Sequence, residues 1–311
     1  MGATQRLATA AVVLPPLVLA LASPTWVVVL VAAAVAGAVL ELLALLAPHR
    51  VLPMPEPAST GAAEEALAAW PTAGLASLVV VAVWAYDMAA GAAAVALAVA
   101  VVLVRAASAW AAPPRTGSRA RMHILVSALV HVLALVYVAL PLAVATRLPR
   151  LGVPGAPAAD PATTTGVVVL FAAWNVDNGG LVGGNIAWPW AKHPLAPRLS
   201  PKKSWEGVIV GGLLSLASPL LLGLLADATW PDAYPRAFRL PALHHLPLGV
   251  LTTLAMVCGD LVESFLKRAV GVKDSSSIFP GHGGVLDKID GLLFALPAAY
   301  GMLLLLGHRE V

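Results

Sequence analysis

Long apolar segments alternate with short polar or proline-rich segments along most of this chain. A membrane-spanning helix needs about 20 apolar residues, within a range of about 17–25. The segments near that length are 7–23, 25–47, 72–87, 89–107, 122–145, 164–186, 207–226, 247–266 and 289–307. Only Asp87 and Gly91 interrupt the apolar residues near position 88, so a count of eight or ten also fits. The pattern predicts an all-α, polytopic integral membrane protein with about nine transmembrane helices.

Composition supports this reading of the pattern. Of the 311 residues, 59% are hydrophobic and 11% are charged, whereas a soluble domain has about 25% charged residues. A soluble globular enzyme is therefore excluded. The single cysteine, Cys258, excludes an internal disulfide. Segment 7–23 resembles a signal peptide, but Pro24 and a second apolar segment follow it at once, which favours a retained helix.

The basic residues are distributed unequally between the two sides of the predicted membrane. When the nine segments alternate, most of the 19 Lys and Arg residues fall on the side of the N-terminus. By the positive-inside rule that side faces the cytoplasm. The two most polar loops, 187–206 and 267–288, both lie there. We therefore expect a multi-pass protein of the inner (cytoplasmic) membrane, with hydrophobic helices in 1–163 and a catalytic domain in 164–311.

Segment 247–266 carries a polar stripe. Asp260, Glu263, Ser264 and Lys267 stand at positions i, i+3, i+4 and i+7, which is one face of a helix. Acidic groups at membrane depth are costly and usually face a polar interior. The alternative is a pair of structural carboxylates that Lys267 and Arg268 neutralise at the helix end.

The loop after this segment combines glycines with basic residues. Gly281, Gly283 and Gly284 allow the backbone to approach a ligand and offer N–H groups to anionic oxygens. The basic residues can neutralise phosphates; they are Lys267, Arg268, Lys273 and Lys288.

Carboxylates stand at both ends of this loop. Asp260 precedes it, and Asp287 and Asp290 begin the last apolar segment. If the two helices converge, Asp260 and Asp287 can hold Mg²⁺ between the protein and substrate phosphates. That arrangement is typical of phosphoryl and nucleotidyl transfer.

The loop at 187–206 has a similar character. Asp177 lies late in segment 164–186, where an acid does not face lipid. Lys202 and Lys203 follow, and could contact a triphosphate or serve only as topogenic charges. Ser200-Pro201 predicts a turn, and Ser204 predicts a helix N-cap before the segment that starts at 207.

Together these residues resemble the signature of phosphatidate cytidylyltransferases, also called CDP-diacylglycerol synthases. The similar stretches are Ser264-Phe-Leu-Lys-Arg268, Lys273-Asp274, Pro280–Asp290, Gly259–Ser264, and Asp177–Gly179 with Ser200–Trp205. The resemblance covers roughly residues 165–305. It departs from the family at Lys288, where Arg is usual, and at Gly184-Asn185, where a basic residue often follows the glycine. The first half matches only as hydrophobic segments.

The resemblance implies transfer of CMP from CTP to phosphatidate in phospholipid biosynthesis. It implies Mg²⁺ held by Asp260 and Asp287, alone or beside a second cation, and phosphates held by Lys202, Lys203, Lys267 and Arg268. Gly281, Gly283 and Gly284 would shape a phosphate loop, with His282 as its support or as an acid–base group. Asp177 and Asp290 would support the metal or the lysines, and the further substrate contacts would be Ser200, Ser264, Lys273, Asp274 and Lys288.

The expected partners are CTP, phosphatidate and the lipid bilayer, with no nucleic acid. Membrane enzymes of this kind commonly form homodimers. Three alternatives stay open: a CTP-dependent enzyme for another lipid phosphate such as an isoprenoid glycerol phosphate, a transporter, and an inactive scaffold. A transporter should show repeats or broken helices in both halves, whereas only the second half of this chain is polar.

Overall fold

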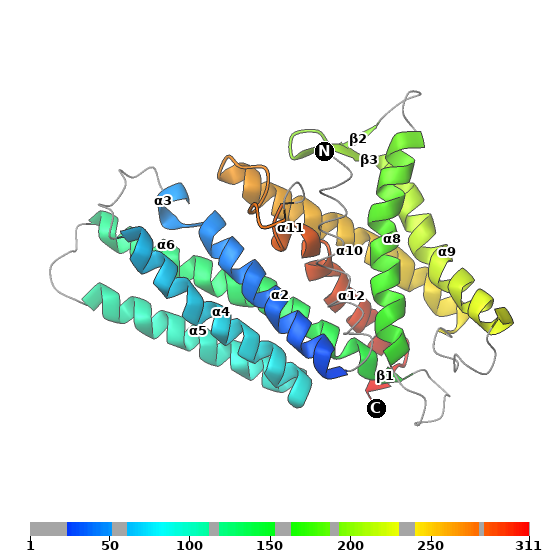
Figure 1. The fold of residues 1–311 in the computed structure, drawn as a ribbon, viewed down its shortest axis with the longest axis horizontal. Coiled ribbons are helices and arrows are strands. Elements are labelled where there is room, and N and C mark those ends of the chain that lie inside the picture. Colours follow the sequence, from blue (N-terminus) through cyan, green and yellow to red (C-terminus); the bar gives the residue numbers. More distant parts are fainter. Residues whose placement is uncertain are drawn as a thin grey trace. The chain divides into compact units, whose positions relative to one another are not determined.

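A computed structural model describes residues 24–51, 61–111, 118–152, 163–186, 193–229, 240–279 and 283–310. It is mostly helical (Figure 1). The longer helices are α2 (Pro24–Leu45), α4 (Gly61–Ala85), α5 (Met88–Ala111), α6 (Ser118–Ala134), α8 (Thr163–Ile186), α9 (Trp205–Thr229), α10 (Ala242–Ala269) and α12 (Leu292–Leu305). The shorter ones are α3 (Pro48–Val51), η1 (Leu135–Ala139), α7 (Leu140–Ala143), η2 (Val144–Thr146), η3 (Leu148–Arg150) and α11 (Leu286–Ile289).

Helices occupy every predicted segment except 7–23, which lies outside the described residues. Within the described residues, five helical stretches are long and apolar enough to cross a membrane: Thr25–Leu45, Met88–Ala111, Arg121–Arg150, Ala242–Ala269 and Leu286–Leu305. Shorter apolar stretches lie at Ala69–Ala85 and Trp205–Leu221. The prediction of a mostly helical, multi-pass membrane protein is therefore supported, while the count of nine stays a prediction.

The chain forms two compact units. Unit 1 contains the residues up to Thr146 together with Leu266–Ile289, and unit 2 contains Arg147–Phe265 together with Asp290–Val311. The segment after α10 thus belongs with the helices of the first half. The predicted functional division at residue 163 stays a prediction.

In unit 1, helix α2 is buried along much of its length. Val35, Ala38 and Leu42 are fully buried, and α2 packs against α4, α6 and α7. Ser77 on α4 donates a hydrogen bond of 3.3 Å to the carbonyl of Ala32 on α2. Helix α2 also contacts α11, which brings it beside the segment that follows α10.

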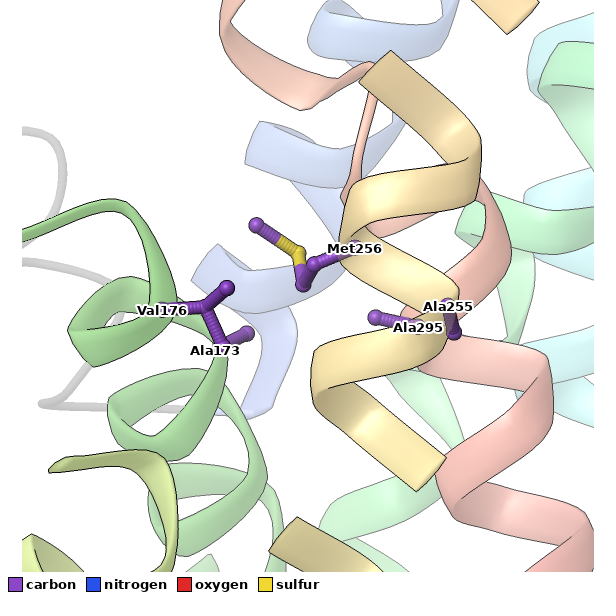
Figure 2. Packing of buried hydrophobic residues seen from close by; sticks show 5 residues of the cluster. All are labelled: Ala173, Val176, Ala255, Met256 and Ala295. Atoms are coloured by element: carbon purple, nitrogen blue, oxygen red, sulfur yellow. The ribbon is translucent and has the colours of Figure 1, made fainter. Parts of the chain in front are cut away.

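In unit 2, small residues allow the helices to approach closely. Helices α8 and α9 pack through facing glycines: a Cβ added to Gly183 would lie 3.0 Å from the Cα of Gly207. Small residues at helix interfaces are typical of membrane proteins. A buried apolar cluster (Ala173, Val176, Ala255, Met256 and Ala295) joins α8, α10 and α12 (Figure 2).

Two small antiparallel sheets complete unit 2. Strand β1 (Leu151–Gly152) pairs with β4 (Arg309–Glu310), and β2 (Pro194–Ala196) pairs with β3 (Ser200–Ser204). The ion pair between Arg147 and Glu310 reinforces the first sheet. The sequence pattern did not predict either sheet, because such short strands have no periodicity of their own.

Candidate active site

Three carboxylates form a cluster in unit 2. One oxygen atom each from Asp260, Glu263 and Asp290 lies within 4.8 Å of the others. Asp260 and Glu263 are neighbours on one face of α10, and Asp290 immediately precedes Gly291 and α12. Helices α10 and α12 pack against each other through the apolar cluster of Figure 2. Met256 of that cluster lies one turn before Asp260 on α10, so the packing lies directly beside the carboxylates.

Gly259 sets the close approach of α10 to the residues before α12. A Cβ on Gly259 would overlap the carbonyl oxygen of Asp290 and lie 2.9 Å from the Cα of Gly291. Any side chain here would therefore push the two segments apart. The glycine before Asp260 therefore has a structural role, because it allows the carboxylate of Asp260 to lie close to that of Asp290.

A lysine from the β2–β3 hairpin reaches the cluster. Lys203 forms an ion pair with Asp260, and both side chains are about one-quarter exposed. Ser204 is the last residue of β3, and its Oγ accepts a hydrogen bond of 3.3 Å from the N–H of Gly207, which confirms the predicted N-cap. The turn predicted at Ser200-Pro201 is wrong: Ser200 and Pro201 begin β3, and the turn occupies 197–199. Pairing with β2 keeps residues 200–204 in an extended conformation.

The cluster has the chemistry of a divalent-cation site. Mg²⁺ prefers oxygen ligands at about 2.0–2.1 Å, which places opposite ligands about 4.2 Å apart. The three oxygen atoms, within 4.8 Å of one another, are close to that requirement. A bound divalent cation would reduce the mutual repulsion of carboxylates that lie this close together. The residues present therefore fit Mg²⁺.

Asp287 lies in unit 1 and has a different set of neighbours. Its Oδ1 accepts a hydrogen bond of 2.6 Å from Lys267 Nζ. Its Oδ2 is 2.8 Å from both the backbone nitrogen and the hydroxyl of Ser275, and 2.7 Å from the Gly284 nitrogen. A joint metal site of Asp260 and Asp287 stays a prediction.

Backbone geometry around Asp287 requires glycine. Gly283 has a φ of +80°, and a Cβ there would lie 2.9 Å from Cγ of Asp287. The Phe279 N–H donates a hydrogen bond of 2.9 Å to the Gly283 carbonyl. Gly281 and His282 lie outside the described residues, and the phosphate loop expected from Gly281, Gly283 and Gly284 stays a prediction.

The remaining predicted residues differ in exposure. Ser264 and Lys267 are buried. The exposed ones are Asp177 on α8, Lys202 on β3, and Arg268, Lys273, Asp274 and Lys288 around the segment after α10. Arg268 Nη1 donates a hydrogen bond of 3.0 Å to the carbonyl of Val272. Ser200 is intermediate in exposure. Whether these residues contact a substrate stays a prediction.

Two further acidic residues lie in buried polar contacts. Glu263 lies on the predicted polar stripe and joins the carboxylate cluster. Glu41 is an acid inside the apolar segment 25–47, and it contacts the segment after α10. The cost of an acid at membrane depth was the signal that could have identified both.

Comparison with known proteins identifies cytidylyltransferases as the similar proteins. A model of the cytidylyltransferase family matches residues 4–306. A phosphatidate cytidylyltransferase of Brucella abortus biovar 1 (strain 9-941) is 38% identical over 147 residues, which is 45% of this chain and 47% of the relative. One from Haemophilus influenzae is 41% identical over 130 residues, 42% of each chain. One from Mycobacterium bovis is 40% identical over 138 residues, 44% of this chain and 40% of the relative. The match thus spans less than half the length of these curated relatives.

Proposed function

Because the chain belongs to the cytidylyltransferase family, we propose that it transfers CMP from CTP to phosphatidate, giving CDP-diacylglycerol and pyrophosphate. The observation that carries the proposal is the cluster of Asp260, Glu263 and Asp290 beside Lys203. The names of the relatives add support for the substrates. On this proposal the protein is a membrane-bound nucleotidyltransferase.

The reaction needs positioning more than it needs a base. A phosphate oxygen of phosphatidate forms a bond to the α-phosphorus of CTP, and the bond from that phosphorus to the α,β-bridging oxygen breaks. The bridging oxygen keeps the electron pair and leaves with pyrophosphate. Since the attacking oxygen is already anionic, the protein must hold two anions in line and stabilise the charge that spreads over the phosphoryl group.

The cluster residues would perform the metal-dependent part of this task. Asp260, Glu263 and Asp290 would hold Mg²⁺, which when bound supplies positive charge to the phosphate oxygens. Lys203 lies beside Asp260 and would contact a phosphate, with Lys202 next to it. Asp287 forms an ion pair with Lys267 and would orient that lysine toward a phosphate.

Orientation follows from the substrates. CTP comes from the cytoplasm and the diacyl tails stay in the bilayer, so the loops 187–206 and 267–288 would face the cytoplasm. Their basic residues agree with the positive-inside rule. In a bacterial cell this would place the enzyme in the inner membrane, and a homodimer remains an expectation.

The test uses the purified full-length chain in detergent with Mg²⁺, CTP and dioleoyl phosphatidate. We expect lipid-linked cytidine and pyrophosphate to form in equal amounts. Asp260→Asn should abolish the reaction, whereas Asp87→Asn should not. Asp87 is a matched control because it is exposed and accepts a hydrogen bond of 2.7 Å from the Ala90 N–H; asparagine caps a helix equally well.

The substrate assignment has its own outcomes. Activity with an isoprenoid glycerol phosphate but none with phosphatidate would keep the nucleotidyl transfer and overturn the lipid. Absence of product with every lipid phosphate, from protein that still binds CTP, would overturn the proposed reaction. Equal loss of activity in Asp260→Asn and Asp87→Asn would remove the argument for the carboxylate cluster.

A further inference from the structure

Glu41 is a buried carboxylate near the end of α2. Glu41 is 4% exposed, and from Trp26 to Leu45 it is the one polar residue of this helix. Acidic residues in such positions are costly and are usually functional. The proposed reaction does not use Glu41 directly, so its burial calls for another explanation.

Four donors from the segment after α10 surround this carboxylate. Oε1 is 2.7 Å from the Ser276 hydroxyl and 2.9 Å from the Val285 nitrogen. Oε2 is 2.7 Å from the Leu286 nitrogen and 3.1 Å from the Ser275 hydroxyl. The donors come from two arms, 275–279 and 283–286. Glu41 therefore joins both arms to α2.

The contact extends to Asp287 through Ser275. The Ser275 hydroxyl lies 3.1 Å from Glu41 and 2.8 Å from Asp287, so its proton can serve either carboxylate. The Ser275 nitrogen also donates to Asp287. The arms that Glu41 holds are thus the same arms that orient Asp287 and, through it, Lys267.

Two glycines make room for this arrangement. A Cβ on Gly284 would lie 2.5 Å from Cδ of Glu41 and would also overlap the Ser275 hydroxyl. A Cβ on Gly37, one turn before Glu41, would lie 3.3 Å from the Val285 side chain. Glycines on both α2 and the second arm therefore allow these two segments to pack closely.

We propose that Glu41 is a positioning residue, which fixes the two arms so that Gly283, Gly284, Asp287 and Lys267 are arranged to receive the phosphates of CTP. The role in catalysis rests on the proposed function, whereas the contact itself does not. Among the described residues, each oxygen of Glu41 accepts from one backbone N–H, which can only donate, and from one serine hydroxyl. A carboxylate satisfies both N–H groups at once, whereas in Glu41→Gln the amide nitrogen would face one of them as a second donor.

The first experiment measures backbone amide exchange in the full-length protein in detergent. In Glu41→Gln, peptides that contain Val285 and Leu286 should exchange about tenfold faster or more, because buried donors lose their acceptor. Peptides from α8 and α9 should be unchanged, and Asp87→Asn should match wild type throughout. If residues 283–286 exchange in Glu41→Gln at the same rate as in wild type, the proposal is overturned.

The second experiment separates positioning from simple loss of stability. We expect Glu41→Gln to raise KM for CTP about tenfold or more, while KM for phosphatidate stays near wild type. A fall in kcat alone, with unchanged KM for CTP, would indicate a smaller fraction of folded enzyme and would overturn the positioning role.

A milder variant covers the case in which Glu41→Gln does not fold. Ser276→Ala removes one donor and leaves α2 intact, so it should accelerate exchange in the same peptides by a smaller factor. Wild-type exchange in Ser276→Ala would count against the proposal. If wild type makes no product from CTP and phosphatidate but the exchange differences persist, the proposed function fails and the contact stands.

Discussion

Replacing Gly259 by alanine tests whether close helix packing assembles the carboxylate cluster. The new Cβ would lie 2.9 Å from the Cα of Gly291 and 3.1 Å from the carbonyl carbon of Asp290. Carbon atoms pack at about 3.5–4.0 Å, so α10 and the residues before α12 must separate by about 0.6–1 Å. That movement would widen the gap between Asp260 and Asp290.

The cost can be worked from these distances. Overpacking of this kind costs about 1–3 kcal/mol, and alanine returns about 0.5–1 kcal/mol relative to glycine in a helix. We therefore expect a net loss of about 0–2.5 kcal/mol in the free energy of unfolding. A displacement of about 1 Å at a reacting centre can cost about 100-fold in rate, so the loss in kcat/KM should exceed the loss in stability.

The assay pairs thermal unfolding in detergent with cytidylyl transfer to dioleoyl phosphatidate. Gly301→Ala is the matched control: Gly301 lies in α12, and a Cβ there would meet no atom within 4 Å. This variant should be neutral or slightly more stable, with wild-type activity. If Gly259→Ala behaves like Gly301→Ala, the close approach does not assemble the cluster and the reasoning is refuted.

Three further predictions follow from single side chains. Asp287→Asn should abolish most product formation. If the residual activity requires more Mg²⁺, Asp287 acts as a metal ligand. If only the KM for CTP rises, Asp287 acts by orienting Lys267. His308 is buried, which lowers its pKa below the usual 6.5, so the folded state favours the neutral ring and stability should fall as pH drops below about 6.5. Thermal unfolding between pH 7.5 and 5.5 should show a smaller loss in His308→Gln than in wild type. Ser204→Ala should cost about 0.5–1 kcal/mol of stability by removing the N-cap of α9, and an unchanged unfolding midpoint would show that the 3.3 Å bond to Gly207 contributes nothing.

Local patterns carried most of what could be predicted. Helix ranges followed from apolar segment lengths, because a helix that crosses a membrane must satisfy its backbone internally. Spacing on α10 placed Asp260 and Glu263 on one face, and the structure groups them. Both inferences depend only on the geometry of a single helix, which the sequence specifies directly.

Tertiary pairing could not be obtained in this way. Asp290 joins Asp260 and Glu263 because Gly259 and the apolar cluster allow α10 and α12 to approach closely. Lys203 reaches Asp260 from a hairpin whose strands are only three and five residues long. A single sequence does not distinguish a lysine that pairs with a carboxylate from a lysine that binds a phosphate.

Glu41 illustrates the same limit over a longer distance and suggests why the first half is present. Its donors stand 234 to 245 residues away along the chain, so no spacing rule connects them. Yet an uncompensated carboxylate in α2 would be too costly to bury, and the two arms would lose their acceptor without it. Each therefore requires the other. The apolar helices of unit 1 bury α2 on several sides and so hold Glu41 at a fixed place. Glu41 in turn orients the two arms, which contact Asp287.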